Sequence, residues 1–122
     1  MNTREVGEKL VSLCQQGQNM DAISELYDKN IESFEATAPP EMLHVKGIDA
    51  VRKKNEWWFG NFEINSSKVE GPFVNGKEFA TIFEYDITAK GGPDKGKRSQ
   101  MREIAVYTVN DGGKIVKEEF LY

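Results

Sequence analysis

Residues 98–122, RSQMREIAVYTVNDGGKIVKEEFLY, contain two strand-like segments separated by a turn. Apolar and polar side chains alternate along 98–109 and again along 114–122, which is typical of strands with one buried face. Residues 110–113, NDGG, lie between them and are a strong hairpin signal, because Asn, Asp and Gly accept the backbone angles of tight turns. We therefore predict that the chain ends in an antiparallel hairpin.

Alternation along this hairpin determines which side chains share a face. Pairing across the turn predicts four opposite pairs: Val109 with Lys114, Tyr107 with Val116, Ala105 with Glu118, and Glu103 with Phe120. One face then holds Met101, Glu103, Ala105, Tyr107, Val116, Glu118, Phe120 and Tyr122. This face is aromatic, and it carries two carboxylates, Glu103 and Glu118, in a diagonal relation.

The rest of the chain places helices before most of the strands. Helical spacing of apolar residues predicts helices over 2–17, 21–28 and 48–59, with Asn2 and Glu5 as a capping pair for the first. Strands are predicted over 30–36, 62–74 and 77–89, and Pro39-Pro40 breaks regular structure after the first strand. Helices followed by a run of antiparallel strands predict a single α+β domain over residues 1–122, with helices on one sheet face.

Composition excludes several classes of protein. The chain has 122 residues, 30% of them charged, and a net charge of −4, which argues against nucleic-acid and anionic-membrane partners. One cysteine, Cys14, and one histidine, His44, exclude a disulfide framework and a His-rich metal cage. The P-loop-like residues 91–98, GGPDKGKR, carry Arg98 where Ser or Thr is needed and join two strands. We expect no cofactor and no metal, and the absence of a signal-like apolar stretch predicts a cytoplasmic protein.

The second face of the sheet is charged in places. In 77–89 the inward list is Phe79, Thr81, Phe83, Tyr85 and Ile87, which leaves Glu84 and Asp86 outside, within reach of Arg102. Two interpretations stay open for this outer face: a solvated surface with weak ion pairs, or a dimer contact.

Four segments together give a resemblance to a known superfamily: 26–31 (LYDKNI), 47–51 (GIDAV), 69–76 (VEGPFVNG) and 107–116 (YTVNDGGKIV). In order and spacing the chain resembles the nuclear transport factor 2-like (NTF2-like, cystatin-like) superfamily, and within it the SnoaL-like and ketosteroid-isomerase-like proteins. The resemblance implies a strongly bent sheet that wraps N-terminal helices in its concave face, forming a cone. It also implies an apolar small molecule in the open end and a homodimer through the outer sheet face.

The resemblance also suggests where catalytic groups would lie. The oxyanion donors of steroid isomerases would fall on Leu10 and Ala105, neither of which donates a hydrogen bond. The general base would fall on Glu35, and the acid–base histidine of related cyclases would have to be His44.

The candidate catalytic residues are Glu103, Glu35, His44 and Glu118. Burial beside aromatic groups and a second carboxylate raises the pKa of a carboxyl toward neutrality, which suits a general acid or base. Trp57 and Trp58 are 100° apart on a helix, so we expect one in the core and one on the pocket wall. The candidate ligand-binding residues are Tyr27, Phe34, Trp57, Trp58, Phe62, Phe83, Met101, Tyr107 and Phe120.

Three functions remain open at this point. The first is acid–base catalysis (isomerisation, cyclisation or dehydration) on an apolar metabolite, with Glu103 or Glu35 moving the proton and His44 or Glu118 as its partner. The second is non-catalytic binding of an apolar metabolite. The third is a structural dimeric domain whose cone is filled by its own side chains.

Overall fold

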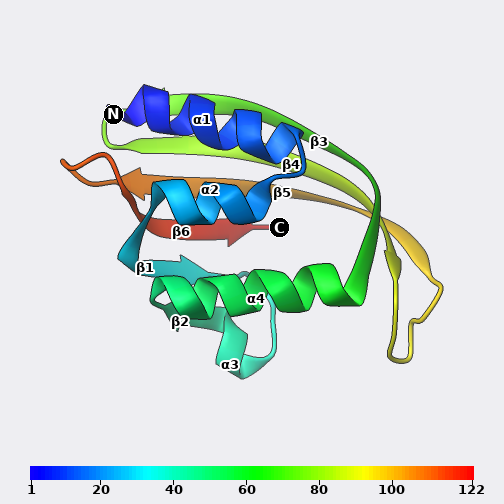
Figure 1. The fold of residues 1–122 in the computed structure, drawn as a ribbon. Helices are drawn as coiled ribbons and strands as arrows, with labels where there is room; N and C mark the ends of the chain where they lie inside the picture. Colours follow the sequence, from blue (N-terminus) through cyan, green and yellow to red (C-terminus); the bar gives the residue numbers. More distant parts are fainter.

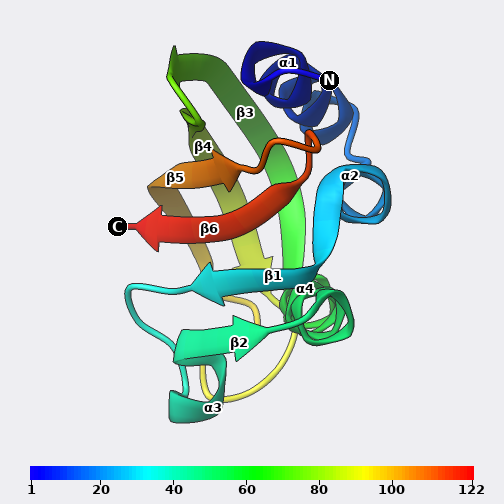
Figure 2. The same ribbon diagram turned by 90° about the vertical axis from the view of Figure 1, so that its left-hand side faces the viewer.

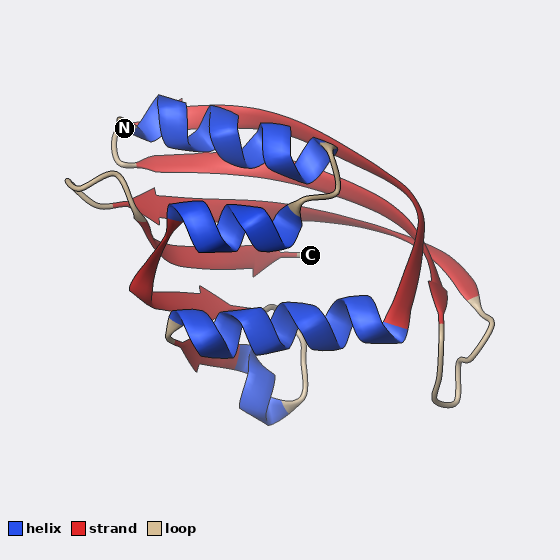
Figure 3. Cartoon of the chain, in the orientation of Figure 1, coloured by secondary structure: helices blue, strands red, loops and turns tan.

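The computed structural model describes residues 1–122, and helices precede most strands, as the sequence predicts (Figures 1 and 3). The elements in chain order are α1 (Thr3–Gln15), α2 (Asn19–Leu26), β1 (Tyr27–Phe34), α3 (Pro40–Leu43), β2 (His44–Lys46), α4 (Ile48–Asn61), β3 (Phe62–Asn75), β4 (Glu78–Ala89), β5 (Arg98–Val109) and β6 (Ile115–Leu121). None of the helices is long and apolar enough to span a membrane.

The six strands form one sheet in the order β2-β1-β6-β5-β4-β3. Every neighbouring pair is antiparallel except β1 and β6, which run parallel. The sheet bends strongly, and α1, α2 and α4 pack against its concave side (Figure 2). This is the α+β cone that the resemblance implies, and it leaves the inward side chains of β4, β5 and β6 facing the helices.

Helix α1 begins where the capping pair predicts. The Asn2 side chain accepts a hydrogen bond from the Glu5 amide at 2.8 Å, and Glu5 Oε1 accepts one from the Asn2 amide at 3.0 Å. Two amide groups that the helix start leaves free are thereby satisfied. The buried side of the helix includes Cys14, which lies in the hydrophobic core.

The elements between Asn19 and Lys46 differ from the prediction: β1 begins three residues earlier than predicted, and β2 is an additional short strand. Helix α2 ends at Leu26, because Tyr27 has extended backbone angles and is the first residue of β1. Residues 40–43 form the short helix α3 where only a break was predicted. Pro40 occupies the first turn of this helix. A backbone N–H at this position would have no acceptor within the helix, so the N–H that proline lacks is not needed.

The register of the final hairpin also differs. Val109 pairs with Ile115 rather than Lys114, and a further shift between Thr108 and Val109 pairs Tyr107 with Glu118 and Ala105 with Phe120. A two-residue shift keeps Glu118 and Phe120 on the inner face. Val116 was wrongly placed there: Ile115 is fully buried instead, and Val116 is half-buried. Glu103 and Glu118 are therefore not diagonal neighbours, since Glu118 lies opposite Tyr107, two inward positions from Glu103 along β5.

The outer sheet face carries charged pairs. Arg102 Nε lies 3.3 Å from Glu84 Oε1, as predicted, whereas Asp86 pairs with Arg98 at 2.7 Å rather than with Arg102. In the register, Arg102 is opposite Glu84, and Asp86 is opposite Gln100. Beyond Arg102 along β5, the outer face carries the exposed apolar side chain of Ile104.

Helix α1 approaches β3 closely at Gly7. A Cβ on this residue would lie 2.7 Å from Pro72 Cβ, closer than packed carbon atoms allow. We predict that Gly7→Ala destabilises the protein by about 1 to 3 kcal/mol, because α1 would have to move off the sheet. Urea unfolding at equilibrium measures this change.

Gly60→Ala is the matched control. Gly60 is also helical, and a Cβ on this residue would meet nothing within 4 Å, so alanine there should be neutral or stabilising by up to about 1 kcal/mol. Equal stability of the Gly7 variant and the wild type would contradict the close packing of α1 on β3.

Candidate active site

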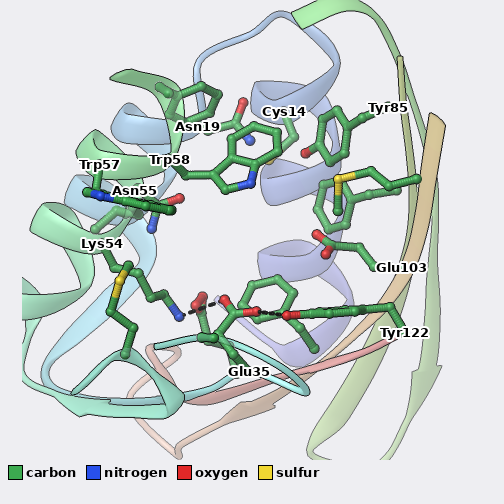
Figure 4. Close-up of a pocket in the computed structure, with 18 of the residues that line it drawn as sticks. Cys14, Asn19, Glu35, Lys54, Asn55, Trp57, Trp58, Tyr85, Glu103 and Tyr122 are labelled. Carbon is green, nitrogen blue, oxygen red and sulfur yellow. Dashed lines mark hydrogen bonds and ion pairs between the residues drawn. The ribbon is translucent and has the colours of Figure 1, made fainter. Parts of the chain in front are cut away.

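A cavity of about 290 Å³ lies between the concave face of the sheet and helices α1, α2 and α4 (Figure 4). Of its 25 lining residues 17 are apolar, so the cavity suits a ligand with an apolar body. Residues 37–39 and Met42 from α3 also border it.

Most of the predicted site residues border this cavity. They are Tyr27, Glu35, Trp57, Trp58, Phe62, Phe83, Met101, Glu103, Tyr107, Glu118 and Phe120. Their positions follow from strand alternation and from the helical face of α4; what they do there stays a prediction. Leu10 also borders the cavity and Ala105 is fully buried, so no hydrogen-bond donor stands at either position.

His44 and Phe34 lie outside the cavity, which corrects their predicted place in the site. Ser33 faces inward from β1, so its neighbour Phe34 faces outward by alternation. The rings of Phe34 and His44 stack with centroids 4.3 Å apart, and His44 Nε2 is 3.9 Å from Glu32 Oε2. His44 is therefore not available as the partner of a cavity carboxylate.

Both tryptophans border the cavity, whereas the sequence predicted one of them in the core. Trp58 is half-buried against Tyr85 and Phe62, with ring centroids 5.3 and 5.6 Å apart. Trp57 is 46% exposed. Because α4 runs along the border of the cavity, two of its neighbouring faces contact that space.

A buried lysine, Lys54, lies at the centre of an ionic network that the sequence pattern did not predict. Its side chain is only 7% exposed. The ammonium Nζ lies 3.0 Å from Glu35 Oε1 and donates a hydrogen bond to Ser33 Oγ. The helical spacing could have predicted its position. Lys54 is three residues after Val51 and four before Trp58, so it lies on the same inward face of α4 as these two residues.

Glu118 is held at both carboxylate oxygens. Tyr27 donates its hydroxyl to Oε1 at 2.5 Å, and Ser33 donates to Oε2 at 2.9 Å. Burial raises the pKa of Glu118, and the charge of Lys54 with these two hydrogen bonds opposes the rise. Burial, followed by the charge of Glu118, also raises the pKa of Tyr27. Glu118 thus has no free oxygen to offer a ligand.

Glu35 is occupied as well. Its Oε1 pairs with Lys54, and its Oε2 lies 2.8 Å from the hydroxyl of Tyr122. That hydroxyl also lies 2.7 Å from the carbonyl oxygen of Thr37 and accepts a hydrogen bond from the Thr37 amide at 3.3 Å. The last residue of the chain therefore helps to fix Glu35 at the cavity.

Glu103 is the exception among the three cavity carboxylates. It makes no hydrogen bond or ion pair with the protein, and it extends from β5 on the side of the cavity opposite Lys54 (Figure 4). Burial raises the pKa of Glu103 to about 7, and the charges of Glu35 and Glu118 add to this rise while Lys54 opposes it. Near neutral pH this carboxyl is present in both its acidic and its basic form.

The bent sheet, the enclosed helices and the apolar cavity define a protein of the NTF2-like, cystatin-like class. The family model described as the SnoaL-like domain matches residues 1–122. The chain belongs to the SnoaL-like family.

Solved structures agree with this assignment. One is a Mesorhizobium loti protein described as a proposed SnoaL-like polyketide cyclase and, in brackets, as a carbohydrate phosphatase. It is 38% identical to this chain, the match covers 100% of both chains, and the TM-score is 0.92. An NTF2-like protein of Burkholderia thailandensis is 17% identical, covering 99% of this chain and 90% of the other, with a TM-score of 0.80. A proposed isomerase of Bacillus subtilis is 17% identical over 98% and 88% of the chains, with a TM-score of 0.74. A search of curated proteins gives no match.

The raised pKa of Glu103 gives a stability prediction. The folded state holds a proton on this carboxyl up to a pKa of about 7, whereas the unfolded chain releases it near 4.5. The stabilisation that protonated Glu103 provides is therefore present below pH 4.5 and lost as the pH rises through 7. We predict that the stability of the wild type relative to Glu103→Gln falls by about 2 to 3 kcal/mol over this interval.

Urea unfolding of the two proteins at a series of pH values measures the difference. Glutamine keeps the shape of the side chain and does not titrate, so contributions from the other carboxyls are shared by both proteins. A difference that stays constant between pH 4.5 and 7 would contradict the assigned pKa of Glu103.

Proposed function

We propose that this protein is an acid–base catalyst that acts on a small, mostly apolar molecule in the cavity, and that Glu103 transfers the proton. The observation that carries the proposal is that Glu103 is the one cavity carboxylate without a protein partner. Glu35 and Glu118 each have both oxygens occupied by neighbouring side chains. A group that exchanges protons with a ligand needs a free oxygen, and Glu103 has two.

The pKa of Glu103 suits this role. A general base works best when its pKa lies close to the working pH, because it is then largely ionised and still basic enough to take a proton. A value of about 7 meets this condition, whereas a carboxyl at its ordinary pKa would be a much weaker base near neutrality.

The reaction class that fits is isomerisation, cyclisation or dehydration through proton transfer at carbon. The Glu103 carboxylate takes a proton from a carbon beside a polar multiple bond. The electron pair of the C–H bond forms a double bond to the adjacent atom, and the π electrons of the polar bond move onto its electronegative atom. The protonated carboxyl then returns the proton to another carbon or to a leaving oxygen. The walls of Trp58, Phe62 and Phe83 hold the apolar body and limit access of water.

The second candidate is non-catalytic binding of an apolar metabolite by the same cavity. The aromatic walls favour it independently of Glu103, because they bind a ligand whether or not a proton moves. Native mass spectrometry of the freshly purified protein distinguishes retained ligand from an empty cavity. The third hypothesis, a cone filled by its own side chains, is not proposed, since about 290 Å³ stays open.

Hydrogen–deuterium exchange at carbon tests the catalytic proposal without knowledge of the natural substrate. We predict that the wild type speeds the α-exchange of at least one member of a panel of cyclic enones and aryl ketones in D₂O, measured by proton NMR. Glu103→Gln should reduce this exchange by about 100-fold or more, because general-base contributions are of that size.

Glu56→Gln provides the matched control, since Glu56 is exposed on α4 and does not border the cavity. It should exchange at the wild-type rate. Exchange by Glu103→Gln at the wild-type rate would remove Glu103 from the mechanism, and binding of the ketones without any exchange would favour the second candidate.

We also propose a homodimer through the outer sheet face. Ile82, Ile104 and Leu121 lie opposite one another across β4, β5 and β6, and Ile104 and Leu121 are 43% and 47% exposed. Phe73, which pairs with Ala80 on the same face, is 55% exposed. An apolar row of this kind on a sheet suits a self-complementary contact between two copies.

Sedimentation velocity tests this assembly. The wild type should sediment as a dimer, and Ile104→Asp should shift it to monomer, because a charge at the centre of an apolar contact would be buried without a partner. Leu43→Asp, at an exposed position on α3 away from this face, should leave the dimer intact. A monomeric wild type, or a dimeric Ile104→Asp, would contradict the proposed interface.

A further inference from the structure

Removal of a proton from carbon creates negative charge on the substrate, and that charge needs a donor. In a carbonyl compound it collects on the oxygen. Leu10 and Ala105 carry no hydrogen-bond donor, so the donor must come from elsewhere on the cavity wall. The hydroxyls of Tyr27 and Tyr122 already have acceptors in Glu118 and in Glu35 or Thr37. The hydroxyls of Tyr85 and Tyr107 on the same wall are donors without a charge, and a cation stabilises developing negative charge more strongly.

Lys54 is the one cationic side chain among the residues that line the cavity. An ammonium carries three N–H donors. Ser33 Oγ and Glu35 Oε1 account for two of them, and no other acceptor contacts Nζ. One donor is left, and its neighbour on the wall is the Phe120 ring, whose centroid is 5.2 Å from Nζ.

The position of Lys54 relative to Glu103 fits a shared substrate. Lys54 extends from α4 and Glu103 from β5, and the two side chains point toward the same space from opposite sides (Figure 4). Glu35 and Ser33 fix the ammonium in place, so little reorganisation is needed when charge develops near it. These two are positioning residues, while Lys54 and Glu103 would contact the substrate.

We infer that Lys54 binds the carbonyl oxygen of the substrate and stabilises the enolate that forms when Glu103 removes a proton from the adjacent carbon. This inference rests on the proposed function and names its substrate class: carbonyl compounds with an acidic C–H and an apolar body. The C–H electron pair forms the new C=C bond, and the C=O electrons move to oxygen beside the ammonium. The carboxyl of Glu103 then returns the proton, so no oxidant or reductant is consumed.

Binding of a stable enolate mimic tests Lys54 separately from Glu103. The probe is 4-nitrophenol, whose anion places charge on oxygen as an enolate does, and the experiment uses Glu103→Gln protein, which lacks the proposed base. We expect this protein to bind the phenolate about 10-fold or more tightly than the neutral phenol, measured by absorbance titration across the pKa of the probe. Equal affinity for the two forms, or no binding of the phenolate, would overturn the inference.

A triple variant locates the effect. Adding Glu35→Gln and Lys54→Met removes the ion pair as a unit, while Glu118 keeps its hydrogen bonds from Tyr27 and Ser33. The preference for phenolate should disappear, while 4-nitrotoluene, a neutral probe of similar shape, should bind as before and show that the cavity is intact. Lys53→Met in the Glu103→Gln background, at an exposed position, is the matched control and should keep the preference.

The outcomes separate the two claims. A triple variant that still prefers the phenolate would overturn the role of Lys54 and leave the ketone exchange test of Glu103 unaffected. Loss of exchange in Glu103→Gln together with loss of phenolate preference in the triple variant supports both. If the triple variant does not fold, the comparison of phenolate with phenol in Glu103→Gln alone decides the inference.

Discussion

The buried ammonium of Lys54 is the interaction on which the rest of the cavity depends, because it neutralises carboxylates that the fold has removed from water. Glu35 lies 3.0 Å from it, and Ser33 links it to Glu118. Loss of one member of such a buried network costs about 3 to 5 kcal/mol, since the remaining charge has no partner. The network also joins three separate elements: Lys54 comes from α4, Ser33 and Tyr27 from β1, and Glu118 from β6. Polar groups thus help to define how the helix sits on the concave sheet.

The same network explains why Glu103 differs from its neighbours. The ammonium of Lys54 pairs with Glu35 and opposes the rise in the pKa of Glu118. Glu103, in contrast, has no hydrogen-bond or ion-pair partner in the protein. Burial and the surrounding negative charge then favour its protonated form. A carboxylate that accepts hydrogen bonds from the protein and one without such partners differ in pKa and in their ability to exchange a proton with a ligand, even when both line one cavity. The chain belongs to the SnoaL-like family, and the proposal that Glu103 transfers a proton rests on this environment.

The sequence predicted the parts of the fold that depend on local pattern. Alternation placed Glu103, Glu118 and Tyr107 on one inward face, and the capping pair of Asn2 and Glu5 fixed the start of α1. The sequence did not predict the register shift between Thr108 and Val109. An extra residue in a strand changes which residues lie opposite one another, although the segments before and after it each still alternate. His44 was expected at the site as the only histidine of the chain, but it lies outside the cavity, because its position depends on β2 pairing with β1. Lys54 was missed because charged residues are rarely buried, and only the three-dimensional positions of Ser33 and Glu35 explain why this one is.

The central claim is that Glu103 is a buried, unpartnered carboxyl able to give and take a proton near neutral pH. The most direct measurement is a carbon-13 NMR titration of the side-chain carboxyls, with the Glu103 resonance assigned by its disappearance in Glu103→Gln. We predict a midpoint at about pH 7 for this resonance. A midpoint near the ordinary value of 4.5 would contradict the claim, because Glu103 would then be a solvated carboxylate with no special capacity for proton transfer.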